Sequence, residues 1–413
     1  MAKDRPTILQ IIPRLDAGGA ELSVVEIAGA IARAGGRALV LAEPGRLAAD
    51  ITRAGGEVMP FPAASKNPLR LIANARGIAG IAVREKVDLI HARSRAPAWS
   101  ALLAARRIGV PFVTTYHGAY GESNRLKRLY NSVMARGDVV IANSRFTAGL
   151  IAARYATPPD RIAVIHRGVD PAAFDPAAIN PERVAALRRR WDIGPDRRVI
   201  LHAARLTRWK GQAVLIDAAA RLQAQGRLGD AVVVLAGDPQ GRDDYVADLR
   251  SRIARLNLEE HVRLPGHVTD IAAAYLAAHV TVIASTEPEA FGRTAIEAAA
   301  VACPVVATDL GAPPETVLAP PAAPTEGATG WLIPPGDAEA LAERLALALA
   351  LPEPVRTRMG ERARRHVLAN FSVGAMQKDT LAVYDRLLGT NLHAKHELGS
   401  SQAGSVQAPV QRS

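Results

Sequence analysis

Residues 280–298 read VTVIASTEPEAFGRTAIEA and contain a strand, a loop and the start of a helix. The β-branched run Val280–Ala284 predicts a buried strand, and the Ala-rich segment after it predicts a helix with an apolar face. Strands that alternate with helices build a parallel sheet whose two faces are covered. The repetition of this unit along the chain therefore decides the fold class.

The same alternation runs through both halves of the 413 residues. One hydrophobic core rarely serves more than about 300 residues, so two domains are expected. We predict an α/β protein with two doubly wound, Rossmann-like parallel sheets. The predicted strands are Thr7–Ile12, Ala38–Ala42, Glu57–Phe61, Asp88–His91, Phe112–Tyr116, Asp138–Ala142, Ile162–Ile165, Val199–Ala203, Ala231–Ala236, Val262–Leu264, Val280–Ala284, Val305–Thr308 and Trp331–Ile333.

The pattern restarts after an arginine-rich segment, which sets the expected domain boundaries. Residues 1–182 form the first domain, residues 183–198 the linker and residues 199–370 the second domain. A last helix is expected within residues 371–390. Residues 391–413 are rich in Gly, Ser, Gln and Ala without an apolar period, which predicts a disordered tail.

The composition excludes several classes of protein. Apolar residues make up 49% and charged residues 22%, as in globular rather than disordered or fibrous chains. The single cysteine, Cys303, excludes a disulfide framework and indicates a reducing compartment. The sequence shows neither a signal peptide nor the ~18 unbroken apolar residues of a spanning helix, so a cytoplasmic location is expected.

The positive charge is unevenly distributed. Residues 1–185 hold 25 basic and 15 acidic side chains, whereas residues 186–413 hold 26 and 25. An arginine-rich genome would raise both halves alike, so the first half is expected to meet an anionic partner. A nucleic acid is disfavoured, because aromatic residues are only 4% and the basic residues are dispersed. A lipid surface and a phosphorylated acceptor stay open.

Two strand-to-helix turns carry groups that suit a phosphate. Gly18 and Gly19 follow the first strand, where a helix start offers free N–H groups. Arg205 and Lys210 follow the strand Val199–Ala203, and two cations there suit a diphosphate. A tight turn and a solvated loop are the alternative interpretations.

Of the three glutamates in the opening stretch, Glu289 and Glu297 are separated by seven residues. Glu289 is expected in the loop and Glu297 about one turn inside the helix. One carboxylate could bind the hydroxyls of a sugar and the other those of a ribose. The backbone N–H groups near Gly292–Thr294 could hold a phosphate.

Taken in order, these motifs resemble those of the retaining glycosyltransferases of family 4, including those that build the bacterial envelope and lipopolysaccharide. The family has the GT-B architecture, in which two Rossmann-like domains face each other across a cleft. The resemblance extends to about Leu388. Its landmarks are Gly18-Gly19-Ala20-Glu21, Tyr116-His117-Gly118, Gly168-Val169-Asp170, Arg205 through Lys210-Gly211, Glu289 with Glu297, Gly311 through Glu315, and Gly330 through Asp337.

The resemblance implies that the second domain binds a nucleotide-sugar donor and the first an acceptor. It assigns catalytic roles to His117, Glu289, Arg205 and Lys210. It assigns donor binding to Gly18, Gly19, Arg205, Lys210, Phe291, Gly292, Arg293, Thr294 and Glu297. In this family the departing phosphate is thought to take the acceptor's proton, so no metal and no other cofactor is expected. The donor base is left open among UDP, GDP and ADP.

The sequence departs from the family at a few positions. Arg167 stands where the family often has asparagine, which adds one cation. Ala290 and Ala312 stand where glycine is common. These departures leave the fold intact and put the sugar preference in doubt.

The excess of basic residues indicates what kind of acceptor the first domain binds. Arg93 and Arg95 follow the strand Asp88–His91 and are expected to face the cleft. Residues 124–136 are predicted to form an amphipathic helix with Arg125, Lys127 and Arg128 on its polar face. This helix either lies on an anionic membrane or packs its apolar face inward, and both interpretations stay open.

The expected acceptor is an anionic envelope glycolipid or glycan, either a lipopolysaccharide core or a polyprenyl-diphosphate glycan. Peripheral association with the inner face of the inner membrane follows from it. A soluble sugar-phosphate acceptor and a nucleotide-sugar epimerase of the same fold are the alternatives. A nicotinamide dehydrogenase is disfavoured because the G-x-G-x-x-G fingerprint is missing.

Overall fold

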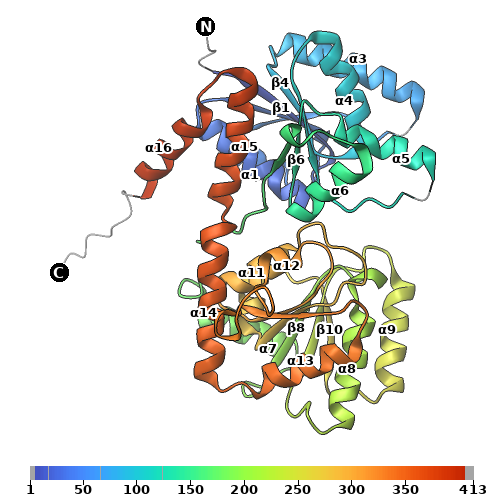
Figure 1. The fold of residues 1–413 in the computed structure, drawn as a ribbon, viewed down its shortest axis with the longest axis vertical. Helices are drawn as coiled ribbons and strands as arrows, with labels where there is room; N and C mark the ends of the chain where they lie inside the picture. Colours follow the sequence, from blue (N-terminus) through green and yellow to red (C-terminus); the bar gives the residue numbers. More distant parts are fainter. Residues whose placement is uncertain (1–4, 17, 66, 123, 405–413) are drawn as a thin grey trace, which may run out of the picture. The chain divides into compact units, whose positions relative to one another are not determined.

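Two parallel sheets, one of seven strands and one of six, form the centres of two structural units. The computed structural model describes residues 5–16, 18–65, 67–122 and 124–404. Unit 1 comprises residues 1–167 and 373–413, and unit 2 comprises residues 168–372. The prediction of two doubly wound parallel-sheet domains is confirmed (Figure 1).

The sheet of unit 1 has the strand order β3-β2-β1-β4-β5-β6-β7, with every pair parallel. The order reverses between β1 and β4, and ligands of such sheets bind beyond the strand ends at that point. The loops that follow β1 and β4 therefore matter most. The strands are β1 (Thr7–Arg14), β2 (Arg37–Glu43), β3 (Glu57–Pro60), β4 (Leu89–Ala92), β5 (Phe112–Tyr116), β6 (Val139–Ala142) and β7 (Ile162–Val164).

Helices cover both faces of this sheet. Ile27 and Ile31 of α1 pack into the core on one face, and Ala101 and Ala105 of α4 pack into the core on the other. The helices of unit 1 are α1 (Gly19–Arg33), α2 (Ala48–Arg53), α3 (Pro68–Arg84), α4 (Arg95–Ile108), α5 (Arg125–Ser132), α6 (Arg145–Tyr155), α15 (Val373–Leu388) and α16 (Leu392–Gly404).

The sheet of unit 2 has the order β10-β9-β8-β11-β12-β13, again with every pair parallel. Its order reverses between β8 and β11, so the loops after these two strands lie at the switch point. The strands are β8 (Val199–Ala203), β9 (Val232–Ala236), β10 (Val262–Gly266), β11 (Val280–Ile283), β12 (Val305–Thr308) and β13 (Gly330–Ile333).

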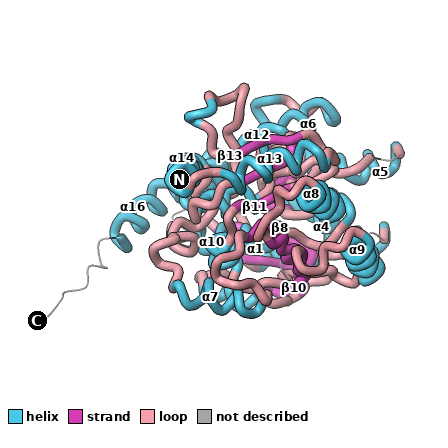
Figure 2. The backbone as a smooth tube through the Cα atoms, turned by 90° about the horizontal axis from the view of Figure 1, so that it is seen from below, coloured by secondary structure: helices cyan, strands magenta, loops and turns pink. Residues whose placement is uncertain are grey.

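Two apolar cores flank the second sheet, and Figure 2 shows its strands enclosed by helices. Leu215 and Leu222 of α8 belong to one core, and Ile296 of α11 and Val367 of α14 belong to the other. The helices of unit 2 are α7 (Pro181–Arg190), α8 (Gln212–Ala224), α9 (Asp243–Arg255), α10 (Ile271–Ala277), α11 (Arg293–Ala300), α12 (Pro313–Thr316), α13 (Ala338–Ala350) and α14 (Glu353–Asn370).

The boundaries between the units differ from those predicted from the sequence, which ended the first domain at residue 182. Residues 168–182 belong to unit 2, because the Val169 N–H donates to Phe371 O at 2.8 Å and Phe174 packs against Tyr275. Residues 183–198 include most of α7 and are part of unit 2 rather than a free linker. Residues 373–388 return to unit 1, where Tyr384 is fully buried.

The expectation of a disordered tail from residue 391 is wrong for Leu392–Gly404, which form α16. Asp385 holds the start of this helix by accepting the N–H groups of Leu392 at 2.7 Å and His393 at 2.9 Å. Leu392 is buried in the core beside α1 and α15. A single apolar anchor and a capping carboxylate give no apolar period, so the pattern of the sequence does not reveal the helix.

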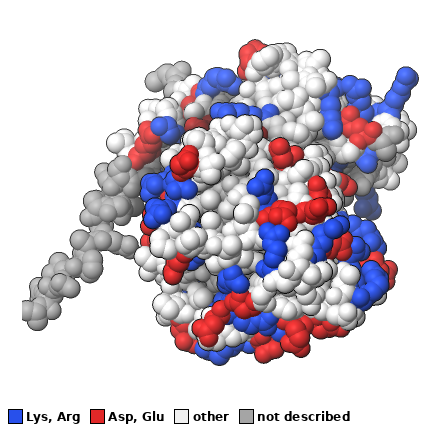
Figure 3. Space-filling view, turned by 60° about the horizontal axis from the view of Figure 1, so that its bottom comes forward, with Lys and Arg blue, Asp and Glu red and all other residues white. Residues whose placement is uncertain are grey.

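The surface shown in Figure 3 carries basic and acidic side chains interspersed with neutral ones. Within the described part of the chain, every helix is too short or too polar to span a membrane.

Candidate functional site

The loops after β8 and β11 are in direct contact at the switch point of unit 2. Gly211 has φ +76°, and a Cβ there would lie 1.8 Å from the Ala284 carbonyl oxygen. The Thr286 N–H donates to Trp209 O at 2.7 Å. Only glycine permits this approach, so the sequence Lys210-Gly211 fixes the position of the lysine against the glutamate loop.

Lys210 and Glu289 form an ion pair in which both side chains are mostly buried. Lys210 Nζ contacts Glu289 Oε1, and Ser285 Oγ donates to the same oxygen at 2.6 Å. Lys210 Nζ also lies 4.2 Å from the centre of the Trp209 ring. The ammonium group is therefore held at the sheet edge by a carboxylate and an aromatic face. The sequence predicts both residues there, although it does not predict their contact.

The Glu289 backbone is held by a second loop. The Ala312 N–H donates to Glu289 O at 2.9 Å, and Gly311 has φ +87° with its Cβ position only 2.3 Å from that oxygen. A side chain at residue 311 would displace the loop. Ala312, where the family often has a second glycine, is accommodated without a positive φ.

Glu297 lies in α11 and binds two side chains of its own unit. Its Oε1 accepts Arg293 Nε at 3.0 Å, and its Oε2 accepts the Tyr275 hydroxyl at 3.3 Å. Burial and the Glu297 carboxylate raise the pKa of Tyr275 well above its ordinary value, so this hydroxyl stays a donor. Sequence reasoning missed Tyr275, and its only signal is a lone aromatic in an Ala-rich helix.

The remaining candidates of unit 2 surround α11. Gly292 precedes the helix with φ +81°, and Thr294 Oγ1 donates to Ala203 O at 3.2 Å, which ties the helix start to the end of β8. Phe291 is buried against Phe371. Arg205 is exposed and makes no ion pair with any residue that the structure describes. Its carbonyl oxygen accepts Gln212 Nε2 at 2.9 Å.

Unit 1 places a histidine and an arginine together beyond β5. The Arg167 guanidinium contacts Nδ1 of His117. Arginine can only donate, so Nδ1 is the acceptor and the proton of the neutral ring resides on Nε2. Burial and the nearby Arg167, Arg93 and His91 hold the pKa of His117 well below its ordinary value. His117 is therefore a neutral ring whose buried Nε2–H lacks an acceptor among the described residues.

Arg93 is buried inside unit 1, whereas the sequence predicts that it faces a cleft and is available to an acceptor. It is 3% exposed, and its Nη2 donates to Ser23 Oγ of α1 at 2.5 Å. Burial lowers its pKa. Beside it, His91 contacts the Tyr384 hydroxyl and Thr115 Oγ1, each at 2.7 Å, so the returning helix α15 completes this polar core.

The glycines after β1 start α1. Gly18 has an extended φ of 164° and precedes Gly19, the first residue of the helix, and both are exposed. A Cβ at Gly18 would lie 2.3 Å from the Glu21 carboxylate. Both glycines are thus exposed at the helix start with the Glu21 carboxylate beside them, and anion binding there stays a prediction.

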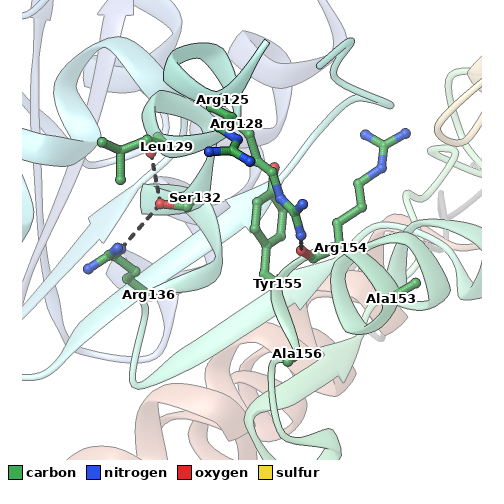
Figure 4. A pocket seen from close by; sticks show the side chains of 9 residues that line it. All are labelled: Arg125, Arg128, Leu129, Ser132, Arg136, Ala153, Arg154, Tyr155 and Ala156. Carbon is green, nitrogen blue, oxygen red and sulfur yellow. Dashed lines mark hydrogen bonds between the residues drawn. The ribbon is translucent and has the colours of Figure 1, made fainter. Parts of the chain in front are cut away.

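The other acceptor candidates separate into two groups on either side of α5. Arg95 donates to Asn131 Oδ1 at 2.8 Å, and its guanidinium carbon lies 3.9 Å from the centre of the Tyr120 ring. A hollow of about 530 Å³, called here the Arg95 hollow, is lined by Ser94, Arg95, Ala96, Leu126, Lys127 and Tyr130. A second hollow of about 480 Å³, called here the Arg125 hollow, is lined by Arg125, Arg128, Leu129, Ser132, Arg136, Ala153, Arg154, Tyr155 and Ala156 (Figure 4).

The structure groups no three His, Cys, Asp or Glu side chains of the described residues in a way that could hold a metal ion. Asp243 and Asp244, which superficially suggest such a cluster, lie in the first turn of α9.

Comparison with known proteins connects both sites to one class of enzyme. Residues 17–173 match the family described as Glycosyltransferase Family 4, and residues 184–366 match Glycosyl transferases group 1. The D-inositol 3-phosphate glycosyltransferase of Kineococcus radiotolerans is 32% identical over 90% of this chain and 91% of its own.

Solved structures agree. A glycosyltransferase from Rickettsia africae superposes with a TM-score of 0.85 and 33% identity, over 94% of this chain and all of its own. The HepE protein of Anabaena, solved in complex with UDP-glucose, gives 0.79 and 26% identity over 92% of this chain and all of its own.

Proposed function

Because the chain belongs to the glycosyltransferases of family 4 and group 1, we propose that it moves a sugar from a nucleotide-sugar donor to a phosphorylated sugar acceptor. The reaction retains the configuration at the anomeric carbon. The bond from that carbon to the diphosphate oxygen breaks, and a bond to the acceptor's hydroxyl oxygen forms on the same face. The hydroxyl proton passes to the departing phosphate oxygen.

The observation that carries the donor half of this proposal is the Lys210–Glu289 pair at the switch point of unit 2. Lys210 stabilises the negative charge that grows on the departing diphosphate, which is usually the largest catalytic contribution. Arg205 adds a second cation from the exposed side of the same loop. Glu289 binds sugar hydroxyls and Glu297 the ribose. The UDP-glucose complex of the Anabaena protein supports a donor of this class.

His117 contributes from unit 1 as a hydrogen-bond donor. Its Nε2–H is fixed by the Arg167 contact on Nδ1 and can donate to a sugar oxygen near the reacting carbon. Gly18 and Gly19 offer N–H groups at the start of α1 to a phosphate oxygen.

We assign binding of the acceptor to the Arg95 hollow. Arg95 and Lys127 line it together with Tyr130, and a volume of about 530 Å³ accommodates a sugar phosphate. Two cations beside aromatic and aliphatic carbon suit a phosphate attached to a sugar ring. The name of the Kineococcus relative, a D-inositol 3-phosphate glycosyltransferase, favours a soluble sugar phosphate over a lipopolysaccharide.

A lipid-linked acceptor is the second candidate. The exposed leucines of α5, Leu126 at 77% and Leu129 at 54%, favour an acceptor presented at a membrane. Both candidates share the phosphate that Arg95 and Lys127 bind. Soluble sugar phosphates and polyprenyl-phosphate sugars, offered separately to the same enzyme, distinguish them.

A thermal-shift screen with UDP, GDP, ADP and their sugars tests the donor site. One nucleoside diphosphate is expected to raise the melting temperature of the wild type and of Arg208→Ala. The melting temperature of Lys210→Ala should not change when the same compound is added. Arg208 is the matched control, since it lies two residues away and pairs with the exposed Asp248. Equal stabilisation of all three proteins would overturn the donor-site assignment.

A further inference from the structure

Tyr120, in the loop after β5, contacts both a residue assigned to the sugar and a residue assigned to the acceptor phosphate. The centre of its ring lies 4.5 Å from that of Tyr116 and 3.9 Å from the Arg95 guanidinium carbon. Its hydroxyl oxygen accepts the backbone N–H of His117 at 3.3 Å. A Cβ at Gly118 would lie only 3.0 Å from this ring, so the glycine leaves room for the ring to pack against β5.

The loop that carries Tyr120 is fixed by side chains of the neighbouring helices. Arg154 of α6 donates from Nη1 to Tyr120 O at 2.6 Å, and Asn131 of α5 donates from Nδ2 to Gly121 O at 3.3 Å. Asn131 is fully buried, and its Oδ1 accepts Arg95 Nη1 at 2.8 Å. One buried amide therefore connects the acceptor arginine to the loop that contains the tyrosine.

The Arg95 guanidinium is held by two neutral groups at the edge of the Arg95 hollow. The Tyr120 ring attracts it through the π electrons, and Asn131 accepts one of its N–H groups. Burial raises the pKa of Tyr120 to about 12, so this ring carries no charge at neutral pH. Since neither partner neutralises the guanidinium, an anion in the hollow can pair with it.

We propose that Tyr120 is a positioning residue that aligns the acceptor with His117. The inference rests on the proposed function and extends it to the way unit 1 presents a phosphorylated acceptor. The ring fixes the Arg95 guanidinium before the acceptor binds, which lowers the entropy that binding would otherwise cost. The hydroxyl of the same side chain fixes the backbone of His117. The acceptor phosphate and the reacting sugar are thereby held at a constant separation.

Two substitutions separate the roles of the ring and the hydroxyl. Tyr120→Phe keeps the ring beside Arg95 and removes the oxygen that accepts from His117. We expect its kcat to fall about threefold, while KM for the acceptor stays within error. Tyr120→Leu removes both contacts, so we expect the same loss of kcat and a rise of at least about threefold in the acceptor KM. A merely structural role would change the acceptor KM and the donor KM alike.

Steady-state kinetics of the full-length protein test the proposal. The donor is the nucleotide sugar found in the thermal-shift screen. The acceptor is D-inositol 3-phosphate, or a polyprenyl-phosphate sugar if the soluble compound is not a substrate. The donor KM should be the same in the wild type and both Tyr120 variants. Tyr120→Phe keeps the test valid if the leucine variant fails to fold.

The matched control is Tyr245 of unit 2, whose ring also lies beside an arginine. The Arg208 guanidinium carbon is 5.2 Å from the centre of this ring, and the Tyr245 hydroxyl donates to Gln212 Oε1 at 3.1 Å. Tyr245→Phe and Tyr245→Leu remove the same groups from another place in the molecule. We expect both to leave the acceptor KM unchanged.

A double-mutant cycle identifies the group through which the ring acts. Arg95→Ala alone should raise the acceptor KM, and Tyr120→Leu added to it should raise that KM no further, because the ring acts through the guanidinium. Multiplied effects in the double variant would overturn the proposal. So would an acceptor KM that Tyr120→Leu leaves unchanged, or one that Tyr120→Phe raises as much as Tyr120→Leu.

The proposed function and this inference fail in different ways. A wild type that transfers sugar to neither acceptor would overturn the proposed function, and this inference with it. A wild type that transfers sugar, with Tyr120 variants that match it in kcat and in both KM values, would overturn this inference alone. Each variant should also retain the nucleotide-induced rise in melting temperature, since the donor site lies in unit 2.

Discussion

The two units contain similar sheets but differ in net charge and in the partners of the cations named at their candidate sites. Unit 1 holds 28 Lys and Arg against 15 Asp and Glu, whereas unit 2 holds 23 against 25. At the unit 2 site, Lys210 and Arg293 each contact a carboxylate, Glu289 and Glu297. At the unit 1 site, the contacts of Arg93 and Arg167 with Ser23 and His117 are to neutral groups.

The side chains that contact these cations indicate which ligand each site can bind. A buried cation is costly unless it is paired, so the carboxylates of unit 2 hold its cations in place and can release them to a diphosphate. In unit 1, Arg93 and Arg95 donate to the neutral side chains of Ser23 and Asn131, and we expect Arg95, which lines the Arg95 hollow, to bind an anionic acceptor.

The largest effect is expected from Lys210→Ala. The substitution leaves the mostly buried Glu289 carboxylate without its cation and removes the charge that stabilises the departing diphosphate. Loss of such a charged interaction costs at least ~2–3 kcal/mol, so initial rates of transfer should fall at least about thirtyfold. Arg208→Ala is the control and should retain its rate. Near-normal turnover of Lys210→Ala would show that the pair is structural only.

Glu297→Gln should have the next largest effect. It keeps the shape of the side chain and loses the charge that Arg293 and Tyr275 contact. We expect kcat/KM for the donor to fall about tenfold, or ~1.4 kcal/mol. Tyr275→Phe removes one neutral donor and keeps the carboxylate, so it should cost less, about threefold. Equal losses in the two variants would mean that Glu297 only supports the packing of α11.

Arg167→Asn introduces the residue that the family often has at this position and should change the pH dependence. Burial, Arg167 and Arg93 hold the pKa of His117 well below 6.5. Removal of one nearby cation raises that pKa, so the imidazolium forms at a higher pH. The acid limb of the rate profile should therefore move upward in pH, while Arg167→Lys, which keeps the charge, should move it less.

The tautomer of His117 can also be measured directly. In the wild type, ¹⁵N NMR of His117 should show the proton on Nε2 of a neutral ring at pH 7, and the Asn variant should mix the two tautomers. An Nδ1 proton in the wild type would contradict the Arg167 contact.

The smallest effect is expected from metal removal. We expect the cations of unit 2 to carry the charge of a diphosphate without a divalent ion. Treatment with EDTA should leave the transfer rate within error of the untreated enzyme. A rate that falls in EDTA and returns with magnesium or manganese would show that the lysine and arginine are insufficient.

Much of the fold and part of the site follow from the sequence. All thirteen predicted strands exist, because β-branched runs between helices leave few other folds. The placement of Lys210 near Glu289 follows from the rule that parallel strands end at one edge. The contact between the two side chains could not be predicted. Lys210 and Glu289 are 79 residues apart in the sequence, and the packing of Gly211 on Ala284 brings them together.

The failures of prediction share a physical cause. The burial of Arg93 depends on Ser23 and α1, and the partner of Glu297 is Tyr275 from another helix. The return of α15 to unit 1 buries Tyr384 beside His91. In each case a segment distant in the sequence forms the surroundings of the residue. Such contacts cannot be predicted from the spacing of nearby residues.

Steady-state kinetics of two variants test most directly whether unit 2 binds the donor and unit 1 binds the acceptor phosphate. KM for the nucleotide sugar and KM for the phosphorylated acceptor are measured in parallel for wild type, Glu297→Gln and Lys127→Ala. We predict that Glu297→Gln raises only the donor KM and that Lys127→Ala raises only the acceptor KM. An acceptor KM that is unchanged in Lys127→Ala, or a donor KM that rises in it, would contradict the assignment of the donor to unit 2 and the acceptor phosphate to unit 1.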